Sequence, residues 1–127
     1  MHRVVCELLA DADLAGARFS LCEEFTDPPA HLNWGGSATI GWYLRIRNGL
    51  IETGAGVIEA DRQILMDYAT VLPFARTVID ATNRDAVHAE LQRAAAEDRF
   101  FRVRDAALPT ALEPLQHLHN ALVAITR

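Results

Sequence analysis

The clearest alternation of apolar and polar positions lies on either side of the Asn48-Gly49 dipeptide. This dipeptide favours a type I′ turn, because both central positions of that turn need a positive φ. When the chain is folded about it, one face of the flanking strands is almost wholly apolar and the other carries opposite charges. The apolar face would pair Ile46 with Ile51, Leu44 with Thr53, Trp42 with Ala55 and Ile40 with Val57. The other face would pair Arg45 with Glu52 and Tyr43 with Gly54. The sequence therefore predicts an antiparallel hairpin whose apolar face needs a cover.

Helical and strand-like patterns alternate along the rest of the chain. Asp67 is placed to cap a helical stripe, and Pro73 should split that stripe into a short turn and a helix that begins at Pro73. The predicted elements are a helix over 3–12, strands over 19–25, 62–66 and 99–104, a loop over 30–37, the stripe over 68–82, a helix capped by Asn83 or Asp85 and ending at Ala96, and a closing helix from 109.

These elements predict an α+β fold, a five-stranded, mostly antiparallel sheet covered on one face by helices, in a single domain over residues 1–127. The cover for the hairpin is expected from the stripe over 68–82 and from the closing helix over 112–125. The apolar face of the closing helix consists of Leu112, Leu115, Leu118, Leu122 and Ile125.

Composition narrows the class of protein. Half of the 127 residues are hydrophobic and the formal charge is −5, which argues against non-specific nucleic-acid binding and against docking onto anionic membranes by charge. No apolar run approaches the ~20 residues that span a bilayer. Glu7, Asp11 and Asp13 follow the N-terminus too closely for a signal peptide. We therefore expect a cytoplasmic protein whose thiols, Cys6 and Cys22, are free.

The search for catalytic or metal-binding motifs yields one unusual carboxylate. The chain has no nucleophile elbow, and Gly54-Ala55-Gly56 lacks the third glycine of a dinucleotide fingerprint. His117 and His119 are spaced by two, which places them on different faces of a helix. We expect no metal and no cofactor. Glu23, however, falls on the apolar parity of its strand. It either pairs with an arginine at a sheet edge or pocket mouth, or lies in the core with a raised pKa.

Several aromatic side chains fall outside the apolar stripes. Phe74 lies about 100° off the stripe of its helix. Phe100 and Phe101 point to opposite faces of one short strand, and Trp34 lies in a glycine-flanked loop. Such residues either line a ligand cavity or fill gaps and anchor loops.

Several segments together resemble the sterol-carrier-protein type 2 superfamily. They are GWYLRIRNG at 41–49 with TGAG at 53–56, ADRQILMDY at 60–68, FRVRD at 101–105, and Leu108-Pro109 with the leucine-rich closing helix. The likeness spans roughly residues 17–124. It implies a five-stranded sheet covered on one side by helices, with an apolar tunnel between them for lipids or fatty acyl chains. It also implies no metal and no covalent chemistry in this domain.

The leading hypothesis is a small intracellular binding protein that holds an apolar ligand, such as a lipid or fatty-acyl chain, between sheet and helices. Its expected lining residues are Trp42, Tyr68, Leu72, Phe74, Leu115 and His119. Of these, Tyr68 or His119 would orient the polar end of the ligand.

Two other classes of function stay open. One is a small α+β-cone enzyme, an isomerase or hydratase, that uses Glu23 or Asp27 with His31. The other is a non-catalytic interaction module, such as a homodimer formed through an apolar edge.

Overall fold

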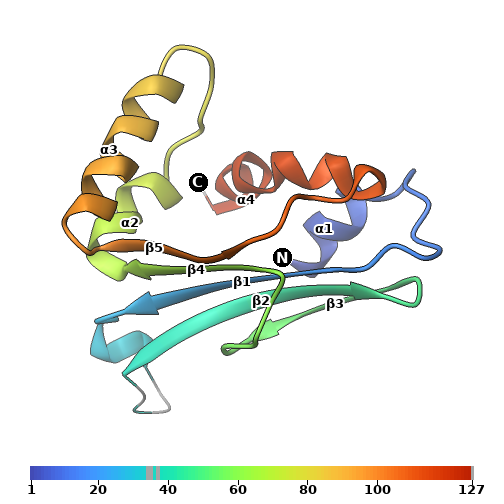
Figure 1. Cartoon of the computed structure of the whole chain (residues 1–127), viewed down its shortest axis with the longest axis horizontal. Helices are drawn as coiled ribbons and strands as arrows, with labels where there is room; N and C mark the ends of the chain where they lie inside the picture. Colours follow the sequence, from blue (N-terminus) through green and yellow to red (C-terminus); the bar gives the residue numbers. More distant parts are fainter. Residues whose placement is uncertain (34–35, 37, 127) are drawn as a thin grey trace.

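A mixed five-stranded sheet forms the base of the molecule, and the α-helices stack on one of its faces (Figure 1). The computed structural model describes residues 1–33, 36 and 38–126, so Trp34 lies outside the described residues. The strands are β1 (Phe19–Thr26), β2 (Thr39–Arg47), β3 (Leu50–Ala55), β4 (Arg62–Asp67) and β5 (Phe100–Asp105), in the order β3-β2-β1-β4-β5. The central pair β1 and β4 is parallel and the other neighbours are antiparallel. The α+β prediction is confirmed.

The β2–β3 hairpin has the predicted turn and register. Asn48 and Gly49 have φ values of 53° and 74°, as a type I′ turn requires. The Arg45 guanidinium lies 3.5 Å from the Glu52 carboxylate. The ladder ends at the Trp42–Ala55 pair, two residue pairs before the predicted Ile40–Val57 pair, because the chain turns away after the Gly56 amide donates to the Gly41 carbonyl.

The helices are α1 (His2–Leu8), α2 (Tyr68–Ala75), α3 (Arg84–Ala96) and α4 (Leu118–Thr126), with 3₁₀ segments η1 (Ala30–Leu32) and η2 (Thr110–His117). The predicted helix beginning at Pro73 is wrong, because α2 runs through Pro73 and ends at Ala75. Asp67 caps α2 by accepting a hydrogen bond from the Thr70 amide at 3.0 Å, so the helix is already formed before the proline. Pro73 then removes a single helical hydrogen bond, and the chain leaves the helix two residues later.

The closing helix also differs from the prediction in its first half. Pro114 lies inside it and disfavours an α-helix, and residues 110–117 form a 3₁₀ helix instead. With three residues per turn, Leu112, Leu115 and Leu118 share one side and all are buried. Ile125, which was predicted to continue this face, is 51% exposed in α4.

Two separate hydrophobic clusters lie between the sheet and the helices. The first cluster joins α1, η2 and α4 to the hairpin side of the sheet. Its buried members are Val4, Val5, Leu9, Ala17, Phe19, Leu44, Ile46, Leu112, Leu115 and Leu118. The second cluster joins α2 and α3 to β4 and β5, and its buried members are Met66, Ala94 and Phe100.

The expectation that residues 68–82 cover the hairpin is therefore wrong, and α1 takes that place together with η2 and α4. The reason lies in the strand order. α2 follows β4 directly, and β4 lies on the far side of β1 from the hairpin. In Figure 1, α2 and α3 accordingly stand over one end of the sheet and α1 over the other.

Candidate ligand-binding site

Glu23 lies on the helix-covered face of the sheet, at the boundary between the two clusters. Its cross-strand neighbours are Trp42 on β2 and Ile64 on β4. Along β1 the same face continues with Leu21 on one side and Phe25 on the other. Leu21 and Trp42 pack against the first cluster, whereas Phe25 and Ile64 pack against the second. We call these five residues the seam.

The carboxyl group of Glu23 is held in an apolar setting. Its side chain is half-buried, and removal from water raises its pKa from 4.5 to about 7. A hydrogen bond from the Trp42 side chain acts in the opposite direction, since it favours the charged form. Within residues 1–33, 36 and 38–126, no arginine or histidine forms an ion pair with Glu23. Of the two interpretations of this residue, the arginine pair is therefore wrong, and the apolar setting favours the raised pKa.

Two residues of α4 form hydrogen bonds with the backbone of the segment 76–83, which connects α2 to α3. The Asn120 side-chain amide accepts a hydrogen bond from the Ile79 amide and donates one to the Ile79 carbonyl, each at 2.8 Å. The His119 Nε2 atom lies 2.8 Å from the Thr77 carbonyl, to which it must donate. These contacts fasten the connection between α2 and α3 to the helix that covers the first cluster.

Three of the six predicted lining residues can be placed beside the seam. Trp42 and Leu115 belong to the first cluster, and Leu115 is fully within it. Tyr68 packs edge-on against Phe25, with ring centroids 6.2 Å apart. The remaining members, Leu72, Phe74 and His119, are half-buried. Their role in binding stays a prediction.

Described residues line two cavities at the surface, and none of the six predicted residues borders either of them. The larger, about 350 Å³, is bordered by Arg62, Leu108, Thr110, Glu113 and Gln116. The smaller, about 160 Å³, lies beside the hairpin turn at Gly16, Ala17, Arg18, Arg47 and Asn48. Neither of these two cavities contains a residue of the seam.

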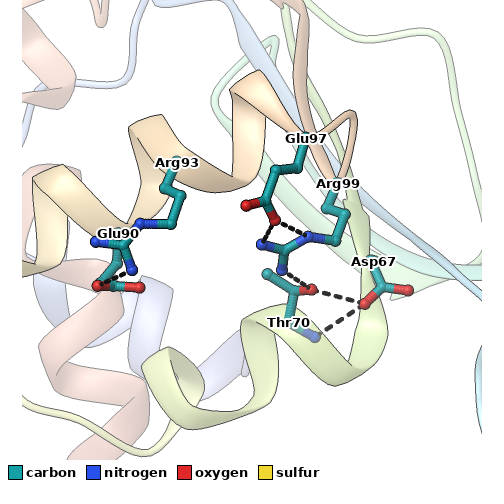
Figure 2. Close-up of polar contacts among 6 residues, drawn as sticks. All are labelled: Asp67, Thr70, Glu90, Arg93, Glu97 and Arg99. Carbon is teal, nitrogen blue, oxygen red and sulfur yellow. Dashed lines mark hydrogen bonds and ion pairs between the residues drawn. The ribbon is translucent and has the colours of Figure 1, made fainter.

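A polar network fixes α2 above the second cluster (Figure 2). The Thr70 hydroxyl donates to Asp67 at 2.7 Å and accepts from the Arg99 guanidinium at 2.6 Å. Arg99 in turn is paired with Glu97, just after α3. The first turn of α2 is thus joined to the passage from α3 into β5.

Other residues singled out by the sequence lie away from the seam. Phe100 is buried in the second cluster, whereas Phe101 points to the opposite face and is exposed. His117 is exposed, as expected. Asp27 and His31 are exposed and follow the end of β1, and their catalytic use with Glu23 stays a prediction.

Sequence reasoning missed three members of the seam, Leu21, Phe25 and Ile64, and also missed Asn120 on α4. The parity of β1 could have found Phe25, since it lies two residues after Glu23. Ile64 was placed on a strand, but its neighbour could not be known before the parallel β1–β4 pairing. Asn120 carries no signal in sequence at all, because its partner Ile79 is 41 residues away.

Comparison with solved structures identifies the fold. The crystal structure of sterol carrier protein 2 matches 96% of this chain and 92% of its own, with a TM-score of 0.52 and 17% identity. The solution structure of TT1886 from Thermus thermophilus, titled a conserved hypothetical protein and possibly a sterol carrier protein, matches 99% of this chain and 83% of its own, with a TM-score of 0.43 and 18% identity. A third match, at a TM-score of 0.40 and 17% identity, covers 90% of this chain but 15% of the sec-alkylsulfatase Pisa1 from Pseudomonas sp..

The chain therefore has a fold of the sterol-carrier-protein-2 type, as the sequence resemblance implied. A scan against family models and a search of curated proteins found no match. In the part of the chain that the structure describes, no helix is both long and apolar enough to cross a membrane.

Proposed function

We propose that this protein is a small carrier that binds an apolar ligand, such as a lipid or fatty-acyl chain, between its sheet and its helices. The observation that carries the proposal is the division of the helix-covered face into two hydrophobic clusters that meet at the seam. A boundary between two clusters can open without breaking either one. The fold shared with sterol carrier protein 2, whose name describes a carrier of sterols, supports the same proposal.

The floor of the binding site would be apolar on both sides of Glu23. Leu21 and Trp42 would contact the ligand from the first cluster, and Phe25 and Ile64 from the second. Each square ångström of apolar surface removed from water contributes about 25 cal/mol, and the cost of ordering the chain and moving the helices is subtracted from that gain. The ligand chain would lie between the two clusters and contact both.

The roof would come from α2, the segment 76–83 and α4. Leu72 and Phe74 supply half-buried apolar surface from α2. Tyr68 supplies a hydroxyl that is an available hydrogen-bond donor and acceptor. The Nε2 atom of His119 donates a hydrogen bond to the Thr77 carbonyl. In a neutral imidazole, the Nδ1 atom would then be an acceptor for the ligand.

The proposal is tested with Nile red, a neutral dye whose emission rises in apolar surroundings. We expect saturable binding of one dye per chain and its displacement by decan-1-ol. Native mass spectrometry of gently purified protein should show a bound small molecule that is lost on mild activation. A linear, unsaturable dye signal together with the bare chain mass would contradict the carrier function.

Two tryptophan substitutions locate the site. Leu72→Trp adds bulk at the roof and should weaken dye binding, because the added ring occupies space that the ligand needs. Leu50→Trp adds the same bulk on β3, where the side chain is 70% exposed, and should leave binding unchanged. Equal affinities for the two variants, both with native melting transitions, would place the ligand elsewhere.

A further inference from the structure

A carboxylate in the middle of an otherwise apolar floor constrains the ligand that the floor can accept. Glu23 is the one polar member of the seam, apart from the indole N–H of Trp42. In a strand that faces a core, an apolar residue at this position would form the most stable protein. The position of Glu23 is therefore costly for stability, and its chemistry points to a ligand.

The hydrogen-bonding capacity of Glu23 is mostly unused. An ionised carboxylate has two oxygens and about four acceptor sites. The Trp42 side chain is the one hydrogen-bonding group among the described residues that lowers the pKa of Glu23. The described residues supply no ion pair to the remaining sites.

The positive charges on the same face are already paired elsewhere. Arg62 donates to the Ala106 carbonyl at 3.0 and 3.2 Å and lies 3.7 Å from Asp105. Arg102 lies over the Phe100 ring and 4.0 Å from Asp105. Neither guanidinium forms an ion pair with Glu23, so the negative charge at the seam is not neutralised by this face of the sheet.

We propose that Glu23 receives the hydrogen-bond-donating head of the bound ligand, and that the protein selects amphiphiles with an amine or alcohol head over free carboxylic acids. The inference rests on the proposed carrier function, and it names the ligand class of the same site. An ammonium head gains an ion pair with a charge-assisted hydrogen bond, and an alcohol gains a hydrogen bond. A carboxylate head would bring a second negative charge against Glu23 and lose affinity.

The experiment compares three probes with the same chain length: decylamine, decan-1-ol and decanoate. Their affinities are measured by calorimetry at pH 8 and below their micelle concentrations, for the wild type, Glu23→Gln and Glu24→Gln. Glu24→Gln is the matched control, because it removes the same charge from the neighbouring residue, which faces the opposite side of the sheet. Both substitutions keep the shape of the side chain.

We expect the wild type to bind decylamine most tightly, decan-1-ol next and decanoate most weakly. Glu23→Gln should lower the affinity for decylamine by about tenfold, which corresponds to the loss of one charge-assisted hydrogen bond. The same substitution should raise the affinity for decanoate. Glu24→Gln should preserve the wild-type order.

Two results would overturn the inference while leaving the carrier function intact. One is a wild type that binds decanoate as tightly as decylamine, and the other is an unchanged order of affinities in Glu23→Gln. If none of the three probes binds the folded wild type, the proposed function itself fails, and the inference fails with it.

Discussion

At the scale of single residues, Glu23 couples stability to pH. Its pKa in the folded protein is about 7, above its ordinary value of 4.5, so the folded state holds this proton more tightly than the unfolded state. The contribution of Glu23 to stability is therefore fully present below about pH 4.5, falls as the pH rises towards 7, and is level above that. The full loss is on the order of 3 kcal/mol, because each pKa unit corresponds to about 1.4 kcal/mol.

Glu23→Gln removes this dependence, since an amide does not ionise. We expect the variant and the wild type to have similar free energies of unfolding at pH 4, and the variant to be more stable by pH 8. Urea unfolding at several pH values measures the difference, and Glu24→Gln controls for net charge. A constant difference between wild type and Glu23→Gln from pH 4 to pH 8 would contradict the raised pKa.

Two glycines of the hairpin differ in what surrounds them. A Cβ at Gly41 would lie 2.8 Å from the Glu23 carbonyl oxygen, which is backbone of the central strand. A Cβ at Gly54 would lie 2.6 Å from the Tyr43 hydroxyl, at the end of a side chain that can rotate. We expect Gly41→Ala to destabilise the protein by about 2–3 kcal/mol, as overpacking does, and Gly54→Ala to cost less. The urea midpoints of the two variants measure these losses of stability. A larger loss for Gly54→Ala than for Gly41→Ala would show that the Tyr43 side chain cannot move aside.

At the scale of elements, the cap of α2 is the local contact that sets where the helix begins. Asp67 accepts hydrogen bonds from the Thr70 amide and hydroxyl. Asp67→Ala should lower the free energy of unfolding by about 1 kcal/mol, the usual cost of a lost N-cap. Glu90→Ala is the control, because Glu90 pairs with Arg93 on the exposed side of α3 and such pairs contribute less than about 0.5 kcal/mol. Equal losses in thermal unfolding would mean that the cap does not support α2.

The elements that the sequence predicted well are those defined by near neighbours. The β2–β3 register follows from a two-residue turn and an alternation that are both local features of the sequence. The end of α2 has no such local signal. Residues after Pro73 keep a helical spacing, yet Val78, Ile79 and Thr82 lie in an irregular segment. Its backbone is satisfied by Asn120 and Asn83 instead of by helical hydrogen bonds.

The candidate site was predicted in part for a related reason. Glu23 stood out because it occupies a position of its strand where the alternation calls for an apolar residue, and this signal is local in the sequence. The division of the core into two clusters is not local, since it depends on which helix covers which strand. The parallel pairing of β1 with β4 joins residues about 40 positions apart and has no short-range signal. The six lining residues were therefore chosen without knowledge of where the two clusters meet.

At the scale of the whole molecule, the two halves of the helical layer are joined by few polar contacts. Asn120 on α4 holds both backbone groups of Ile79, in the connection between α2 and α3. Opening the seam would require the two clusters to move apart, and these hydrogen bonds oppose that motion. In the proposed carrier, these hydrogen bonds are therefore expected to limit how fast a ligand enters and leaves.

Asn120→Ala should speed ligand release without weakening the sheet. The Ile79 amide loses its acceptor, so its hydrogen exchange should accelerate while amides in β1 and β2 keep their protection. The same substitution should also increase the dissociation rate of Nile red, as measured by stopped flow. Asn83→Ala is the matched control, because Asn83 bonds Val78 and Asp80 within the same segment but makes no such bond to α4. If Asn83→Ala accelerates dye release as much as Asn120→Ala does, the order of the segment itself limits release, and the contact with α4 does not.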